Sequence, residues 1–166
     1  MSAGIVQVQQ STIRDYTRQL HLPTVGGQFL KLAEEAIQQK QGHVAFLEVL
    51  LRAELEERER NAIARRIQEA KFPKVKTLEE FKFEEAPQIP AAQIRNLAEG
   101  GYLERSEPII LLGDTGTGKT HLASGLGVEA CRQRKRVRFT TAAELVNELI
   151  EAKNKSESNH RPVDAL

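Results

Sequence analysis

The chain has 166 residues, a length typical of about one compact domain with or without a helical appendage. Its 24 Lys and Arg and 23 Asp and Glu leave a formal net charge of +1. This charge balance excludes a strong overall electrostatic attraction to nucleic acid or to an acidic partner. The single cysteine, Cys131, excludes an internal disulfide framework and a cysteine-based zinc cluster.

The sequence predicts no membrane partner. The longest wholly apolar runs, such as Ile109–Leu112, are far shorter than the roughly 20 residues that cross a bilayer. The first residues, Met1–Val8, contain neither the basic nor the apolar region of a secretory signal. We therefore expect a cytoplasmic protein.

Residues 1–72 are predicted to form a helical N-terminal region. Between Thr12 and Lys71 the chain is rich in Leu, Ala, Glu, Gln, Lys and Arg, and its apolar residues recur at intervals of three and four. Breaks are expected at Leu22-Pro23, because proline restricts the residue before it, and at Gln41-Gly42. Two or three helices fit this pattern better than one rod.

The stretch Arg52–Lys71 is a highly charged helix with a narrow apolar seam, consisting of Leu55, Ala62, Ile63 and Ile67. We interpret it as a solvated helix face with ion pairs one turn apart, and contact with DNA is the alternative. The helix should end at Phe72-Pro73.

Residues 73–107 are predicted to form a linker with short helices. Thr77–Phe83 fits a short amphipathic turn, and Ala91–Glu99 fits a helix that Gly100-Gly101 ends.

Residues 108–166 have the pattern of an α/β domain. Pro108–Leu112 is predicted to be a strand buried on both faces, followed by a helix from Lys119 to about Arg132. A second strand, Val137–Thr140, and a helix from about Ala142 to Ala152 follow, and the polar residues from Lys153 to His160 suit an exposed loop. This order of strands and helices is typical of a parallel sheet.

The segment Gly113–Thr120 matches the phosphate-binding loop pattern G-x-x-x-x-G-K-[ST] without a mismatch. Its glycines allow successive backbone N–H groups to wrap a phosphate, and the helix that follows adds the positive end of its dipole. We expect Lys119 to reach the β and γ phosphates of ATP and the Thr120 hydroxyl to ligate Mg²⁺. The predicted nucleotide site consists of Gly113, Asp114, Thr115, Gly116, Thr117, Gly118, Lys119, Thr120 and His121. The alternative is a glycine-rich turn that only joins a strand to a helix.

The string Ile110–Ala123, which contains this motif and His121-Leu122-Ala123, resembles the Walker A region of AAA+ proteins of the IstB-like group. These are ATP-binding helper proteins of insertion-sequence transposition and are related to DnaC helicase loaders. Upstream segments are similar to the helical N-terminal region of the same group: Phe46–Glu56, Ala70–Pro73 and Leu78–Phe81.

This resemblance implies an AAA+ P-loop NTPase domain with a parallel sheet, self-assembly on DNA, and delivery of a transposase or, alternatively, a replicative helicase. It also implies that His160–Leu166 approaches the Walker B strand, so that the Walker B acids, sensor residues and arginine finger would lie beyond Leu166. We therefore expect a fragment, incomplete at the C-terminus, that binds ATP without efficient hydrolysis. The alternatives are a DnaC-like helicase loader and a truncated module that binds nucleotide or a partner without turnover.

A basic cluster follows the predicted helix of the phosphate-binding loop. It consists of Arg132, Arg134, Lys135, Arg136 and Arg138. One interpretation is that these cations complement the dipole at the C-terminus of the helix. The alternative is non-specific contact with DNA phosphates. His121 is expected to pack after the loop or flank the nucleotide, and Cys131 is expected to be a small buried hydrophobic residue.

Overall fold

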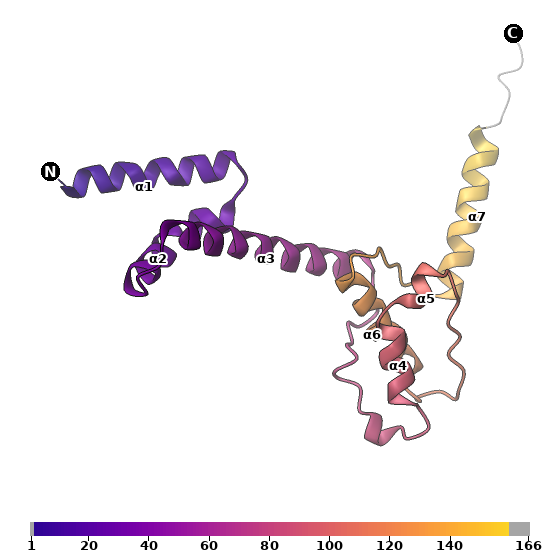
Figure 1. The fold of residues 1–166 in the computed structure, drawn as a ribbon. Coiled ribbons are helices and arrows are strands. Elements are labelled where there is room, and N and C mark those ends of the chain that lie inside the picture. The colour runs from indigo at the N-terminus through magenta and orange to yellow at the C-terminus, as the bar shows by residue number, and fades with distance from the viewer. Residues whose placement is uncertain (1, 160–166) are drawn as a thin grey trace, which may run out of the picture. The chain divides into compact units, whose positions relative to one another are not determined.

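The structure is a computed structural model and describes residues 2–159. Its contacts divide the chain into two compact units, Met1–Ala62 and Ile63–Leu166, with the boundary inside one long helix. We call them the N-terminal unit and the C-terminal unit (Figure 1). The segment His160–Leu166, expected to approach the Walker B strand, lies outside the described residues.

The helices of the N-terminal region confirm the predicted breaks. Helix α1 spans Ser2–Gln19, α2 spans Pro23–Gln38 and α3 spans His43–Glu69. Pro23 occupies the first turn of α2, where its missing N–H costs no hydrogen bond. The second break contains Gly42, as the sequence predicts.

The core of the N-terminal unit is small and lies between α2 and α3. Val25, Phe29 and Leu50 are buried in it, and half-buried apolar side chains pack around them: Leu22, Leu30, Leu32 and Phe46. Helix α1 packs against α2.

Two residues of the charged helix α3 lie on faces other than those predicted for them. Glu54, expected on a solvated face, is only 2% exposed, whereas Leu55, expected in the apolar seam, is 68% exposed. Leu50 and Glu54 are four residues apart and therefore lie on the same face of the helix, which here faces the core. Leu55 is rotated about 100° from that face.

The linker has short elements near their expected positions. A turn closes where the Phe81 N–H donates to the Leu78 carbonyl at 3.2 Å, and a 3₁₀ helix, η1, spans Phe83–Glu85. Helix α4 spans Ala91–Ala98, and α5 spans Gly101–Glu104 after Gly100, whose φ is +83°.

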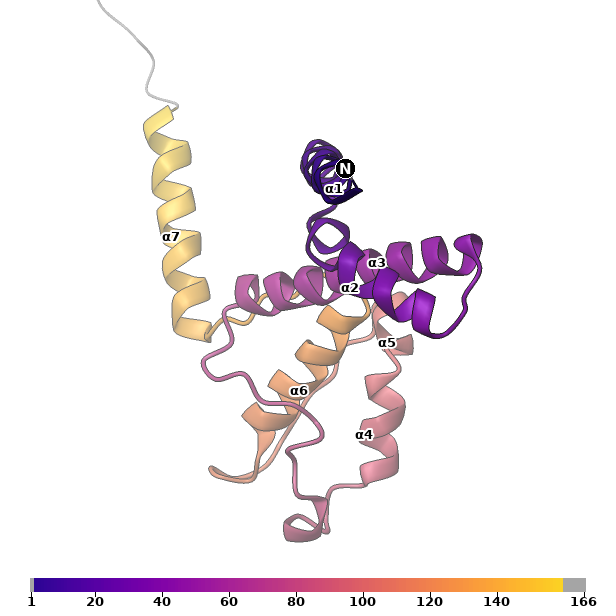
Figure 2. The same cartoon turned by 90° about the vertical axis from the view of Figure 1, so that its left-hand side faces the viewer.

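Two longer helices form the rest of the C-terminal unit. Helix α6 spans Lys119–Arg132, as predicted, and packs beside α4 (Figure 2). Helix α7 spans Ala142–Asn159, so the loop expected from Lys153 onward is helical as far as Asn159. The polar residues of that segment include no proline or glycine, which would have ended the helix.

The two segments predicted as strands have no regular secondary structure among the described residues, and the parallel sheet stays a prediction. Ile110 and Leu112 are 75% and 89% exposed, while Ile109 and Leu111 are half-buried. One side of this segment is therefore exposed in the structure, since no strand among the described residues covers it, and its burial on both faces stays a prediction together with the sheet. Within those residues, no helix is long and apolar enough to cross a membrane.

Candidate nucleotide-binding site

The phosphate-binding loop lies between residue 112 and the start of α6. Gly116 and Gly118 have φ angles of +85° and +86°, and Gly113 has a φ of +150°. Residues with a side chain rarely adopt these left-handed conformations, so the pattern of glycines in the motif matches the backbone that the loop adopts. The glycine spacing thus has a direct structural reason at each of the three positions.

Gly118 is the most constrained of these glycines. A Cβ at this position would lie 2.7 Å from Cε2 of Phe81, which comes from the linker. The Phe81 ring therefore rests against the backbone of the loop at the residue that precedes α6. At Gly116, by contrast, a Cβ would meet no heavy atom within 4 Å.

The Lys119 ammonium is folded over its own loop. Its Nζ donates to the Gly113 carbonyl at 2.7 Å and to the Asp114 carbonyl, and lies 3.4 Å from Oγ1 of Thr117. The Thr117 hydroxyl in turn donates to the Asp114 carbonyl at 2.8 Å. The positive charge is thus held above the loop by acceptors that a phosphate oxygen could replace.

The start of α6 is suited to an anion. Its N-cap residue, Gly118, supplies no side-chain hydrogen bond to the first turn. The first amides of a helix have no partner within the helix, and they carry the positive end of its dipole. The side chains of Asp114, Thr115 and Thr120 are exposed beside them, and Thr120 is the second residue of the helix.

His121 joins α6 to the linker. Its Nε2 lies 2.8 Å from the Thr77 carbonyl, and its ring meets the Phe81 ring edge to face with centroids 5.1 Å apart. Phe81 makes a similar contact with Phe83, at 4.8 Å. His121 therefore packs after the loop, which is one of its two expected roles, and its role beside a nucleotide stays a prediction.

A cavity of about 470 Å³ adjoins the loop on this side. It is lined from the loop and α6 by Gly116, Thr117, Gly118 and His121, and from the linker by Lys76, Glu80, Phe81, Lys82, Glu85, Ala86 and Gln88. The sequence pattern does not predict that the linker lies beside the loop. The available signal was the pair of phenylalanines, Phe81 and Phe83, in an otherwise polar stretch of a chain with only eight Phe and Tyr in total.

A second cavity, also of about 470 Å³, adjoins the loop beside Lys119. Gly113, Asp114, Thr117 and Lys119 line it together with Ile109–Leu112 and residues of α4. The structure therefore brings the glycines and Lys119 of the motif together between two hollows, with Thr120 beside them on α6.

The structure does not bring the basic cluster together as one free surface. Arg132 pairs with Glu79 at 2.8 Å and with Glu129, and Arg138 pairs with Glu148. Lys135 and Arg136 form no ion pair with a carboxylate among the described residues. The ion pairs of Arg132 and Arg138 reduce the local positive charge at both ends of the cluster, so Lys135 and Arg136 between them are the stronger candidates for binding an anion.

Cys131 is fully buried, as expected of a small hydrophobic residue. Burial raises the pKa of its thiol, although the nearby Arg66 charge acts in the opposite direction. A reactive thiolate is therefore disfavoured at this position. Within residues 2–159 there is no group of three or more His, Cys, Asp and Glu side chains placed to hold a metal ion.

Comparison with known families agrees with the geometry of the loop. The family described as IstB-like ATP binding protein matches residues 16–164. The chain belongs to this family. IstB-like proteins are P-loop NTPases.

Individual relatives in this family come from insertion sequences. The chain is 36% identical over 137 residues to the ATP-binding protein of insertion sequence IS5376 from Geobacillus stearothermophilus, covering 82% of this chain and 55% of that protein. It is 39% identical over 125 residues to that of IS21 from Pseudomonas aeruginosa, covering 75% and 47%. An insertion-sequence ATP-binding protein of Mycobacterium tuberculosis is 38% identical over 108 residues, covering 65% and 43%. This IstB-like chain thus spans about half the length of these curated relatives.

Proposed function

We propose that this IstB-like chain binds Mg-ATP through Gly113–Thr120 and acts as an accessory protein in the transposition of an insertion sequence. The observation that carries the first part is the conjunction of three glycines with positive φ, a lysine held over them, and a helix start without a side-chain cap. A turn that only joined two elements would need neither the lysine nor the exposed amides.

A bound nucleotide would replace contacts that Lys119 makes within its own loop. The Lys119 ammonium would exchange the Gly113 and Asp114 carbonyls for oxygens of the β and γ phosphates, because a charged acceptor makes the stronger hydrogen bond. Backbone amides of the loop and of the first turn of α6 would hold the same phosphates.

Thr120 fits the role of a magnesium ligand. Its side chain is exposed in the first turn of α6, next to Lys119, and its hydroxyl makes no hydrogen bond to the described residues. When bound, Mg²⁺ would bridge and neutralise the phosphate oxygens. Thr120 would hold it by one hard oxygen, which is the type of ligand that this ion prefers.

The wider role rests on the relatives. Those compared above are named for insertion sequences, which favours transposition over helicase loading. The partners we propose are DNA, bound without sequence preference, a transposase, and further copies of the protein. Because this chain spans about half of those relatives, the activity of a full-length protein is part of the proposal.

We also propose that Pro108–Leu112 and Val137–Thr140 act as strands of a parallel sheet. Exposed and half-buried residues alternate from Ile109 to Leu112, which is the period of a strand with one covered face. The exposed Ile110 and Leu112 would then belong to the second face, which a complete sheet of this α/β class covers.

The nucleotide site is tested by calorimetric titration of the chain with ATP in the presence and absence of Mg²⁺. Lys119→Ala should abolish measurable affinity, and Thr120→Ala should remove the difference that Mg²⁺ makes. Lys74→Ala, which removes an exposed lysine of the linker, is the matched control. Unchanged affinity in Lys119→Ala, with circular dichroism showing a folded protein, would overturn the assignment.

The wider role is tested by fluorescence anisotropy with labelled duplexes of unrelated sequence and by co-purification with the transposase of the same insertion sequence. We expect similar affinity for all duplexes and capture of the transposase that depends on ATP. Equal capture by wild type and Lys119→Ala would contradict a nucleotide-dependent role.

A further inference from the structure

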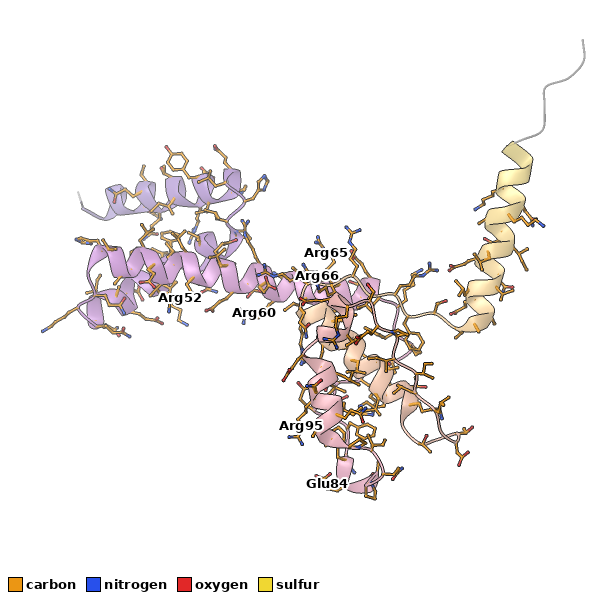
Figure 3. The ribbon with its side chains drawn as sticks, turned by 45° about the vertical axis from the view of Figure 1, so that its right-hand side comes forward. Arg52, Arg60, Arg65, Arg66, Glu84 and Arg95 are labelled. Atoms are coloured by element: carbon orange, nitrogen blue, oxygen red, sulfur yellow. The ribbon has the colours of Figure 1, made fainter. Side chains whose placement is uncertain are left out.

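Arg66 has one buried guanidinium nitrogen without a hydrogen-bond partner among the described residues. It lies in the last turns of α3, within the C-terminal unit, next to Arg65 (Figure 3). Its Nη1 is buried and has no hydrogen-bond acceptor among the described residues. An unpaired buried N–H is costly, and more so on a charged group, so an acceptor that completes this site would be bound favourably.

Arg66 borders a cavity that a second arginine, Arg136, also lines. The cavity has a volume of about 400 Å³ and is lined by Arg66, Glu69, Arg136 and Val137. Arg136 forms no ion pair with a described carboxylate. The Glu69 carboxylate lies 3.8 Å from Nε of Arg65, so Arg65 offsets part of its charge. Two arginines and one glutamate therefore line the cavity, and the lining has a formal net charge of +1.

This cavity is separate from the nucleotide site. Arg136 follows the C-terminal end of α6, whereas Lys119 begins that helix. A helix of 14 residues is about 20 Å long, so one phosphate group cannot contact both. Binding at the two sites can therefore be measured independently.

We propose that Arg66 and Arg136 form a binding site for a phosphate group. A guanidinium presents a planar fork of N–H donors that matches two oxygens of a phosphate, and two forks can hold different oxygens of the same group. A water molecule could accept a hydrogen bond from Nη1 but would add no negative charge to a lining in which two arginines outnumber one glutamate. A phosphate oxygen satisfies the donor and neutralises the charge together.

Two sources supply such a group: the phosphodiester backbone of a nucleic acid and a free phosphate ion. The chemistry of the site is shared, and the proposal does not depend on ATP binding at Lys119. Both sources are tested in the full chain carrying Lys119→Ala, which removes the ammonium group of the phosphate-binding loop and so weakens anion binding there.

The first arm titrates inorganic phosphate and follows its ³¹P signal or the heat of binding. Arg66→Gln and Arg136→Gln should each weaken binding by about tenfold or more, the usual effect of losing a charged hydrogen bond. Arg65→Gln is the matched control, because Arg65 neighbours Arg66 but is 72% exposed and pairs with Glu69. A loss confined to Arg66 and Arg136 assigns a free phosphate site.

The second arm titrates a labelled duplex at several salt concentrations. If the source is the nucleic-acid backbone, Arg66→Gln and Arg136→Gln should each weaken binding to every sequence alike and lower the salt slope by about one, whereas Arg65→Gln should not. Inorganic phosphate at millimolar concentration should then compete only weakly.

The proposal is overturned if both substitutions behave like Arg65→Gln with both probes. It is also overturned if Arg66→Gln alone changes binding while Arg136→Gln has no effect, since the proposed site requires both guanidinium groups. Arg66→Lys, which keeps the charge, covers the case in which Arg66→Gln does not fold: it should retain part of the binding and lose the bidentate contact. If Arg66→Lys binds either probe as tightly as wild type does, bidentate binding by the Arg66 guanidinium group is contradicted.

Discussion

The Glu54 carboxylate accepts a hydrogen bond of 2.9 Å from the backbone N–H of Thr24, 30 residues earlier in the chain. The same oxygen accepts a second bond, of 3.1 Å, from the N–H of Val25. The N-cap residue of α2, Leu22, has no side chain that can accept these bonds. Glu54 therefore caps α2 from another helix, and a negative charge at this end also complements the helix dipole.

We expect Glu54→Ala to destabilise the N-terminal unit by about 2 kcal/mol, because a lost cap and a lost buried charged hydrogen bond have costs of this order. Urea unfolding followed by circular dichroism measures the change. Glu48→Gln is the control: Glu48 pairs with Arg52 in the same helix, but its side chain is 64% exposed. An exposed pair contributes less than about 1 kcal/mol. Equal effects of the two substitutions would contradict the capping role.

The cap also predicts a loss of stability in acid. Burial raises the pKa of Glu54, but hydrogen bonds from Arg58, Val25 and Thr24 outweigh it and hold the pKa below the ordinary value of 4.5. The folded state therefore favours the carboxylate, and its contribution is complete above that value and lost as the pH falls through the lowered pKa. Unfolding free energies at about pH 6 and about pH 3 should differ more for wild type than for Glu54→Gln. Parallel losses in the two proteins would show that other carboxylates cause the acid sensitivity.

The sequence predicted the helices well but missed this contact. Pro23 and Gly42 mark the breaks because their effects are local to the backbone. Whether Glu54 or Leu55 faces the core depends on how α2 packs against α3, and periodicity in a helix with so many charges leaves that choice open. A carboxylate that caps a distant helix has the same local sequence as one in a surface ion pair.

The glycine-rich loop was predictable for a different reason. The phosphate binding that we propose for it requires specific backbone conformations, and those conformations favour glycine at positions 116 and 118. The linker wall of the neighbouring cavity was not predictable in this way, because contacts such as that of Phe81 with Gly118 depend on tertiary packing. The sequence thus indicated the phosphate end of the site but did not indicate what lies beside it.

Gly118→Ala is expected to be the most damaging glycine substitution in the loop. Alanine would adopt a left-handed conformation, at a cost of about 1 to 2 kcal/mol, and its Cβ would also clash with Phe81. Gly116→Ala would incur only the backbone strain, because the space around it is open. Unfolding and ATP titrations measure both effects, and Phe81→Ala should relieve part of the damage in Gly118→Ala.

A helical glycine supplies the control for these substitutions. Gly27 lies in α2 with no heavy atom within 4 Å of the added Cβ, so Gly27→Ala should raise stability by up to about 1 kcal/mol. If Gly118→Ala and Gly116→Ala had the same effect, the contact with Phe81 would contribute nothing.

The ion pair between Glu79 and Arg132 predicts a shifted titration. The hydrogen bond from Arg132 is the main cause that lowers the pKa of Glu79 to about 2 from the ordinary 4.5. Arg132→Gln should therefore raise the pKa of Glu79, though not fully, because backbone and Thr77 hydrogen bonds remain. The chemical shift of the Glu79 side-chain carboxyl carbon, followed by NMR against pH, measures it directly. Arg105→Gln, which disrupts the pair of Arg105 with Glu107, should leave the titration of Glu79 unchanged.

The contact of His121 with the linker predicts how firmly the linker stays beside the phosphate-binding loop. The ring makes a hydrogen bond with the Thr77 carbonyl and an edge contact with Phe81. His121→Phe keeps an aromatic edge but leaves the carbonyl without this partner, so we expect faster amide hydrogen exchange at residues 77–83 and a loss of about 1 kcal/mol. His121→Ala loses both contacts and should open the segment further. His43→Ala removes an exposed histidine of the N-terminal unit and should change neither measurement. Exchange rates at residues 77–83 that were the same in all three variants would show that the linker is held by other contacts.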